Sequence, residues 1–318
     1  MAVPGPGMTG IVSVALLQQL QNEILEAIVC GAPLKTIADL VCLRAEELAP
    51  DVLCSILRVD DQGAVHPLAG PSLPERYSAA LEGLPIGPTA GSCGTAAYRG
   101  EPVEVIDIET DPLWADYKGL ALPLGLRACW SSPIKARDGR VVGTFAFYYR
   151  EPRGPAALER EIVERCVHVC AIAIEHEDAH ARIHQLAYYD TLTSLPNREQ
   201  FQDRAREVLA HAGPAFSVNI LYIDLDDFKG VNDTLGHRVG DLLLEGVARR
   251  LVACTDGAFL ARLGGDEFAV VQPSTGGRGV ACSLAERIIG VLDEPFEFDE
   301  QKARIGASIG IAYTEPGC

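Results

Sequence analysis

The chain has 318 residues, 48% of them hydrophobic, which is enough for two domains that each bury a core. Its formal net charge of -17 argues against a protein that binds nucleic acid or an anionic membrane surface nonspecifically. No apolar run approaches the length of a transmembrane helix and residues 1–5 lack the charged start of a secretory signal, so we expect a cytoplasmic protein with no membrane span.

The first predicted element is a helix with one apolar face. Its apolar positions are Leu17, Leu20, Ile24 and Ile28. They stop before Gly31, a residue typical of helix C-termini, and before Pro33, which breaks helices. We therefore expect the helix to end near Gly31, with residues 1–19 as a helix or tail ahead of the first domain.

Three apolar segments then predict strands of an antiparallel sheet. They are residues 53–59, 103–106 and 141–148. Residues 60–63 form a predicted turn, and the Asp138-Gly139 pair marks a hairpin before the last strand. With helices at both ends, this order is typical of a small α+β sensory module.

Four short segments of this half resemble the GAF domains of bacterial signalling proteins. They are GSCGTA at 91–96, GEPV at 100–103, DPLW at 111–114 and ACWSSPI at 128–134. The resemblance spans about residues 20–175 and implies a pocket for a small ligand such as a cyclic nucleotide. No residue that selects a ligand can be named, so the GAF ligand is unknown, and a dimerisation scaffold without a ligand is the alternative.

The chain contains ten cysteines, scattered without Cys-x-x-Cys spacing. In a reducing cytosol this usage is typical of small buried apolar residues rather than of a disulfide framework. Cys93 and Cys129 fall in two of the GAF-like segments, and two interpretations of them are open. They pack in the core, which we favour, or they form a redox switch or hold a chromophore, although no histidine follows either one as in bilin-binding relatives.

Residues 157–188 contain no proline or glycine and predict one long linker helix. Apolar residues recur along it at alternating spacings of four and three, which predicts a short coiled-coil seam between two chains. The predicted seam consists of Ile162, Cys166, Val169, Ala173, Ile183 and Ala187. His176, His180 and His184 share one face, which predicts either a metal or pH-sensing site or, the interpretation we favour, a hydrated surface.

Two acidic segments follow in the C-terminal half. Residues 216–223 form an apolar run of buried-strand type that ends at Asp224. About forty residues later, Gly264-Gly265 predicts a hairpin turn, and Asp266 and Glu267 begin the outgoing strand. A solvated hairpin would have the same turn alone, but if the strands are neighbours, Asp224 and Asp266 converge. Carboxylates of this kind suit Mg²⁺ or Mn²⁺ bound jointly with substrate phosphates.

These segments closely resemble the GGDEF domain of diguanylate cyclases. The matching motifs are DTLTSLPNR at 190–198, DLDDFKGVND at 224–233, Gly236-His237, Gly240-Asp241, GGDEF at 264–268 and SIGIA at 308–312. The resemblance covers about residues 185–318. It implies a sheet with helices on its faces, related to nucleotidyl cyclase and polymerase palm domains, so the whole chain is expected to be α+β. It also implies conversion of two GTP to cyclic di-GMP and two pyrophosphates.

The resemblance implies a metal site, and catalytic roles for Asp266 and Glu267. Asp224, Asp266 and the backbone carbonyl of Leu225 would bind the metal, two Mg²⁺ (or Mn²⁺) per GTP, with Glu267 close to the same centre. Asp266 would also help to deprotonate the attacking ribose 3′-hydroxyl. A bound divalent cation lowers the pKa of a coordinated oxygen and neutralises phosphate charge.

It also implies how GTP is held. Lys229 and the backbone amides around Phe228 would bind the β- and γ-phosphates, and Lys229 would thereby assist catalysis. Asn232 and Asp241 would bind guanine, since a carboxylate that accepts from N1–H and the 2-amino group cannot pair equally with adenine. The turn glycines Gly264 and Gly265 would line the substrate site. For Lys229 and Asn232, the alternative is a solvated helix surface.

Two departures from the family pattern are visible. Thr255 and Ala258 stand where many cyclases carry the arginine and aspartate of a product-inhibition site, so we expect no inhibition there. The family also continues past residues 308–312 into a helix with basic side chains and a closing strand, so this chain resembles a fragment with weak GTP binding. The variants at 235–237 and 262–263 resemble GGDEF domains that precede an EAL phosphodiesterase domain, as in a longer GAF-GGDEF-EAL protein.

The sequence therefore predicts a GAF-regulated diguanylate cyclase. Because each GGDEF domain would bind one GTP, the enzyme would act as a homodimer through the linker helix and the GAF domain. The alternative is a regulatory GGDEF module that binds GTP without cyclising it and controls a downstream EAL phosphodiesterase. A purely structural dimeric sensor is a third hypothesis.

Overall fold

The computed structural model describes residues 6–211, 217–275, 277–298 and 301–314. The chain forms two compact units, Met1–Ala179 and His180–Cys318, and each has its own sheet and core. A single helix, α6 (Ala157–Tyr188), crosses the boundary and has the predicted bounds. Within the described ranges, every helix is too short or too polar to cross a lipid bilayer.

The N-terminal unit is built on a six-stranded antiparallel sheet in the order β3-β2-β1-β6-β5-β4. Its strands are β1 (Val52–Val59), β2 (Ala64–Ala69), β3 (Leu84–Pro85), β4 (Val103–Val105), β5 (Ala128–Lys135) and β6 (Val141–Tyr149). The three predicted strands are β1, β4 and β6, and Gly139 turns between β5 and β6 with a φ of 88°. The predicted antiparallel sheet is confirmed.

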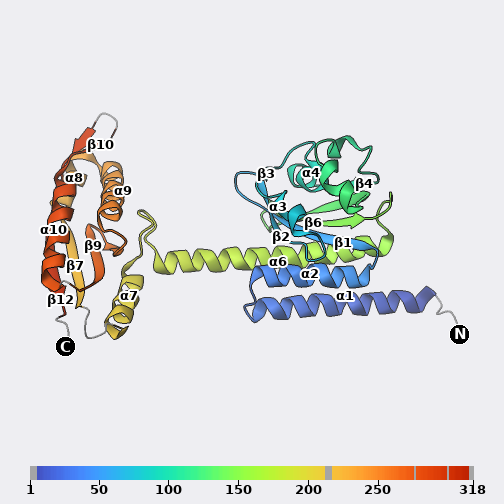
Figure 1. Ribbon diagram of the computed structural model, residues 1–318, viewed down its shortest axis with the longest axis horizontal. Coiled ribbons are helices and arrows are strands. Elements are labelled where there is room, and N and C mark those ends of the chain that lie inside the picture. Colours follow the sequence, from blue (N-terminus) through green and yellow to red (C-terminus); the bar gives the residue numbers. More distant parts are fainter. Residues whose placement is uncertain (1–5, 212–216, 276, 299–300, 315–318) are drawn as a thin grey trace. The chain divides into compact units, whose positions relative to one another are not determined.

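Helices cover both faces of this sheet (Figure 1). The helices are α1 (Pro6–Val29), α2 (Leu34–Leu48), α3 (Glu75–Ala79), α4 (Gly91–Arg99) and α5 (Lys118–Ala121), with 3₁₀ turns η1 (Pro112–Trp114) and η2 (Leu122–Leu124). The core on one face joins α1, α2 and α6 to the sheet, and that on the other face includes α3 and α4. The predicted apolar stripe of α1 is buried, and Gly31 follows the helix with a left-handed φ of 72°.

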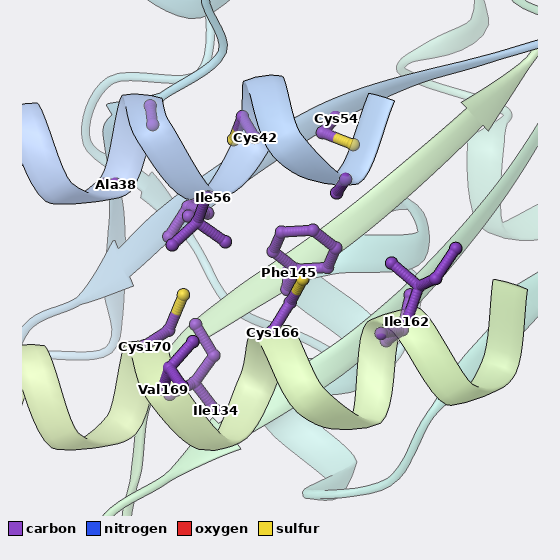
Figure 2. Close-up of a cluster of buried hydrophobic side chains, with 14 of the residues drawn as sticks. Ala38, Cys42, Cys54, Ile56, Ile134, Phe145, Ile162, Cys166, Val169 and Cys170 are labelled. Atoms are coloured by element: carbon purple, nitrogen blue, oxygen red, sulfur yellow. The ribbon is translucent and has the colours of Figure 1, made fainter. Parts of the chain in front are cut away.

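Figure 2 shows the core between the sheet, α2 and α6, where Phe145 of β6 lies between the two helices. Four cysteines lie buried in this core: Cys42, Cys54, Cys166 and Cys170. Burial in apolar surroundings raises the pKa of each of these thiols above its ordinary value. They therefore behave as small apolar residues, as the sequence predicted.

The predicted coiled-coil seam is wrong for its first four positions. Ile162, Cys166, Val169 and Ala173 are all buried in this core, with exposures of 0 to 4%. They pack against the chain's own sheet and α2, because an apolar helix face serves an intrachain core as well as an interchain seam. The second half of α6 presents apolar side chains to solvent, among them Ile183 and Ala187.

The C-terminal unit has a four-stranded antiparallel sheet in the order β12-β7-β9-β8. Its strands are β7 (Ser217–Asp226), β8 (Phe259–Gly264), β9 (Glu267–Ser274) and β12 (Gly306–Tyr313), and a separate hairpin joins β10 (Phe296–Phe298) to β11 (Gln301–Ala303). The helices are α7 (Arg198–His211), α8 (Phe228–Leu235), α9 (His237–Cys254) and α10 (Gly277–Asp293). The core on one face contains α9 and α10, and α7 packs on the other (Figure 1). This is the α+β architecture predicted from the sequence.

Candidate active site

The end of β7 and the turn between β8 and β9 lie side by side. Asp224 is paired with Glu267 in the antiparallel ladder, and the Leu225 amide donates to the Asp266 carbonyl with an N···O distance of 3.3 Å. β7 alternates at this end, so that Leu225 is buried while Asp224 and Asp226 are exposed. The predicted convergence of the two acidic segments is thus present in the fold.

The acids at this edge repel one another. Partial desolvation raises the pKa of Asp224, and the negative charges of Asp266, Glu267 and Asp226 raise it further. Carboxylates this close together favour a bound cation, because the cation removes the repulsion and stabilises the ionised forms. The edge therefore has the electrostatic character of a metal and phosphate site.

The donor atoms also fit a divalent metal. Within the part of the chain that the structure describes, no three His, Cys, Asp or Glu side chains are grouped to hold an ion unaided, and this includes the histidine face of α6. Magnesium in phosphoryl-transfer sites commonly takes one or two carboxylates and completes its shell with water and substrate phosphates. Asp224, Asp266 and the Leu225 carbonyl match that partial set.

A buried arginine fixes the turn. The Arg262 guanidinium is 8% exposed and donates to Asp190 Oδ1 at 2.8 Å and to the Gly265 carbonyl at 2.7 and 3.1 Å. Gly264 and Gly265 have φ values of 137° and 55°, which glycine adopts without strain. Sequence reasoning missed this ion pair, although an arginine inside an apolar strand signals a buried partner.

Glu267 has a cationic partner that the sequence did not reveal. Its carboxylate accepts from the Arg198 guanidinium at 2.9 Å, and Arg198 also donates to the Leu263 carbonyl at 3.2 Å. A hydrogen bond to Glu267 raises the pKa of the neighbouring Tyr222. The charge of Glu267 is therefore partly balanced within the protein, whereas no basic side chain among the described residues pairs with Asp224.

The start of α8 lies directly after the acidic end of β7. Asp227 takes a left-handed φ of 55° and turns the chain, so Phe228 begins the helix and Lys229 stands exposed in its first turn. The first amides of a helix have no intrahelical acceptor and attract anions. The position suits the phosphate-binding role that the family resemblance implies for Phe228 and Lys229.

Asn232 and Asp241 come together where α8 meets α9. A Cβ placed on Gly240 would lie only 1.9 Å from Asn232 Oδ1, so the Asn232 amide rests on the backbone of Gly240. Asp241 is the next residue of α9 and is exposed. Asn232 therefore lies against the residue that precedes Asp241, and the missing side chain of Gly240 permits this approach.

Comparisons with known proteins agree with these features. The family model described as the GGDEF domain of diguanylate cyclases matches residues 187–317, and a GAF domain model matches residues 31–175. Diguanylate cyclase DgcP of Escherichia coli is 32% identical over 65% of this chain and 63% of its own length. The methyl sulfide methyltransferase-associated sensor of Methanosarcina acetivorans is 38% identical over 50% of this chain and 16% of its own length.

A solved structure of a sensory box/GGDEF family protein from Caulobacter crescentus is 42% identical, over 40% of this chain and 83% of that one, with a TM-score of 0.36. The chain spans less than two thirds of the length of either curated relative. Both family models match in the order and at the places where the structure has its two units. The chain therefore carries a GAF domain followed by a domain of the GGDEF family.

Proposed function

We propose that this chain is a diguanylate cyclase that forms cyclic di-GMP and two pyrophosphates from two GTP, under control of its GAF domain. The observation that carries the proposal is the convergence of Asp224 and Asp266 beside the start of α8. A module that only sensed GTP would not require paired carboxylates at this position. The similarity to diguanylate cyclase DgcP supports the same reaction. Since GTP is a cytosolic nucleotide, we place the reaction in the cytoplasm.

Asp224, Asp266 and the Leu225 carbonyl would hold Mg²⁺ or Mn²⁺ in this enzyme. When bound, the metal neutralises phosphate charge and lowers the pKa of a coordinated oxygen. Asp266 lies at the turn, and its carboxylate would accept the proton of the ribose 3′-hydroxyl. The Glu267 carboxylate, paired with Arg198, would add negative charge close to the same metal centre.

The remaining groups would bind and orient GTP. Lys229 and the amides that begin at Phe228 would hold the β- and γ-phosphates, while the missing side chains of Gly264 and Gly265 would let the nucleotide approach the turn. Asn232 and Asp241 would bind the guanine edge. Orientation and charge stabilisation supply most of the catalysis in phosphoryl transfer, so no covalent intermediate is required.

The reaction would need two chains, because each GGDEF domain carries one set of these groups. We assign the pairing surface to the exposed second half of α6, where Ile183 and Leu186 are 63% and 60% exposed. They lie three residues apart, as adjacent seam positions of a coiled coil do. The buried first half of α6 would connect this surface to the GAF core.

One assay tests the proposed function. The purified protein is incubated with GTP and Mg²⁺, and cyclic di-GMP and pyrophosphate are separated by chromatography, with ATP as the matched control substrate. We expect both products from GTP and neither from ATP. Tight GTP binding without product would instead favour a regulatory GTP-binding module, and absence of GTP binding would contradict both functions.

A further inference from the structure

Two cysteines of the GAF core differ from the other buried cysteines in their surroundings. Cys93 is the third residue of α4 and lines a cavity, with 8% of its surface exposed. Cys129 lies behind it on β5 and is 1% exposed. Ser92 Oγ donates to the Cys129 carbonyl at 3.3 Å, and Cys93 and Cys129 belong to the same buried cluster where α4 packs on β5. Both thiols are free.

Hydroxyl groups converge on the Cys93 sulphur. The Tyr148 hydroxyl lies 3.8 Å from it. Ser131 Oγ and Thr144 Oγ1 are buried hydroxyls without a hydrogen-bond partner within the described ranges, and both would stabilise an ionised Cys93 sulphur. Because a buried hydroxyl without a partner is costly, these two indicate an acceptor in the space that Cys93 occupies. The first turn of α4 adds a dipole that also favours a thiolate.

The surroundings of Cys93 change its thiol pKa in the opposite direction to those of the cysteines packed between the sheet, α2 and α6. The neighbouring Cys129 thiol, together with the hydroxyls, outweighs burial and lowers the pKa of the Cys93 thiol to about 7. Burial raises the pKa of Cys129, as it does for Cys42, Cys54 and Cys170. Of these buried thiols, Cys93 combines a stabilised thiolate with access from a cavity.

The cavity limits what can reach the sulphur. It is lined by apolar and aromatic side chains, including Val65, Trp114 and Tyr117, and has about 40 Å³ of space for water-sized molecules. A single water requires roughly 10–15 Å³ on this measure, so the cavity admits one to a few such molecules. A space of this size suits a small hydroperoxide better than a nucleotide or a bilin.

We propose that Cys93 is a peroxide-reactive thiolate and that Cys129 converts its oxidised form to a disulfide. In the first step the Cys93 sulphur attacks a hydroperoxide oxygen, an S–O bond forms and the O–O bond breaks. The leaving oxygen takes a proton and departs as water or alcohol, so the sulphur is oxidised and the peroxide is reduced. In the second step the Cys129 sulphur attacks the Cys93 sulphenic acid. The S–S bond forms, the S–O bond breaks, and the hydroxide leaves as water with the Cys129 proton. The disulfide would tie α4 to β5.

Peptide mapping of the intact, reduced chain after exposure to hydrogen peroxide tests this assignment. Mass spectrometry should find a Cys93–Cys129 cross-link, formed at least about tenfold faster than oxidation of Cys170, whose thiolate is disfavoured. In Cys129→Ser, the reaction should stop at a Cys93 sulphenic acid, which dimedone traps when the peroxide-treated protein is unfolded in its presence. In Cys93→Ser and Cys93→Ala, Cys129 should stay reduced.

Cys170→Ser is the matched control, since it removes a buried thiol from the other core and should leave the cross-link unchanged. Near-ultraviolet circular dichroism checks that each variant is folded. The proposal is overturned if folded wild-type chain forms no Cys93–Cys129 cross-link, or if Cys129 oxidises equally fast without Cys93. It is also overturned if Cys129→Ser yields no dimedone adduct at Cys93. Because these readouts require no GTP, they fail independently of the proposed cyclase activity.

Discussion

The two domains place their reactive groups in opposite environments. The GGDEF domain presents Asp224 and Asp266 at an exposed edge of its sheet, where like charges accumulate. The GAF domain encloses Cys93 in a core whose cavity holds only small molecules. An open edge can take a large charged substrate, since metal and phosphate offset the carboxylate charge, whereas an enclosed thiol selects its reagent by size. The extent of burial therefore decides which reagents can reach the reactive carboxylates and the reactive thiol, and the sequence alone does not show this difference.

The largest expected effect comes from the helix that the domains share. Val169→Asp places an unpaired carboxylate at a fully buried position of the GAF core and should lower its free energy of unfolding by about 4 kcal/mol or more. Ile183→Asp lies on the exposed half of α6 and should leave the stability of either domain within about 0.5 kcal/mol. Thermal unfolding measures both effects.

Sedimentation measures whether Ile183→Asp changes the association of two chains. If the exposed half of α6 pairs two chains, Ile183→Asp should weaken association because the carboxylate would enter the interface. Unchanged association would show that the pairing surface lies elsewhere, and an unaffected unfolding temperature for Val169→Asp would contradict the intrachain packing.

The next largest effect concerns the ion pair beneath the active-site turn. Arg262→Met leaves Asp190 without its cation and should lower the free energy of unfolding of the GGDEF domain by about 3 kcal/mol. Arg204→Met removes the exposed partner of Glu207 and should change it by less than about 0.5 kcal/mol. Denaturant titration of the two variants measures both changes in the free energy of unfolding. Equal changes would mean that the Arg262 ion pair contributes no more stability than an exposed one.

The same ion pair predicts a dependence on pH. Burial alone would raise the pKa of Asp190, but hydrogen bonds from Thr193 and Arg262 outweigh it and lower the pKa below its usual 3.8. A depressed carboxylate pKa contributes stability above the unfolded value, and this contribution is lost as the pH falls through the folded value. The difference between wild type and Arg262→Met should therefore shrink only in acid, at pH below 3.8.

A smaller effect is expected where Asn232 rests on α9. Gly240→Ala introduces a Cβ that would clash with Asn232 Oδ1, so the asparagine must move away from Asp241. We expect GTP binding to weaken by about tenfold, because a shift of this size misaligns the guanine contacts. Gly290→Ala, on α10 with open space around the new Cβ, is the matched control and should bind GTP like wild type. Calorimetry measures both affinities, and unchanged binding in Gly240→Ala would exclude Asn232 from the nucleotide site.

The smallest effect is a change of GAF-domain stability with pH. Its direction is opposite to that of the Asp190 contribution, because it is lost as the pH rises. His66 lies between Asp60 and Glu82, with N···O distances of 3.0 and 2.6 Å, and hydrogen bonds to these carboxylates raise its pKa above 6.5. A raised histidine pKa contributes stability that is complete below the unfolded value and is lost as pH rises through the folded value. The melting temperature of wild type should therefore approach that of His66→Gln as the pH rises above 6.5. A gap that is constant across this range would show that His66 does not titrate.

Much of the fold could be predicted because local patterns and core packing agree in it. The strand that ends at Asp224 and the Gly264-Gly265 turn were predicted from hydrophobic runs and glycine conformations alone, and the structure pairs them as expected. The coiled-coil seam of α6 was mispredicted because heptad spacing identifies an apolar helix face but does not show which part of the protein packs against it. Val169 meets the same spacing rule whether a second chain or the chain's own sheet covers it.

The supporting contacts of the site lay beyond the reach of the sequence. Arg198 and Glu267 are separated by 69 positions and Asp190 and Arg262 by 72, so nothing local links them. The same holds for Cys93, whose hydroxyl neighbours come from β5 and β6. The sequence indicates candidate site residues, but only the packed sheet shows which groups hold them in place.

A pair of asparagine variants tests whether Asp266 belongs to the metal and substrate centre. Cyclic di-GMP formation from GTP and Mg²⁺ should fall by about 10²–10³-fold or more in Asp266→Asn, with the melting temperature unchanged. Asp226→Asn alters a carboxylate of the same edge that instead accepts from Ser308 at 2.7 Å, and it should stay within about tenfold of wild type. Near wild-type turnover by folded Asp266→Asn would contradict the account and remove the turn from the catalytic centre.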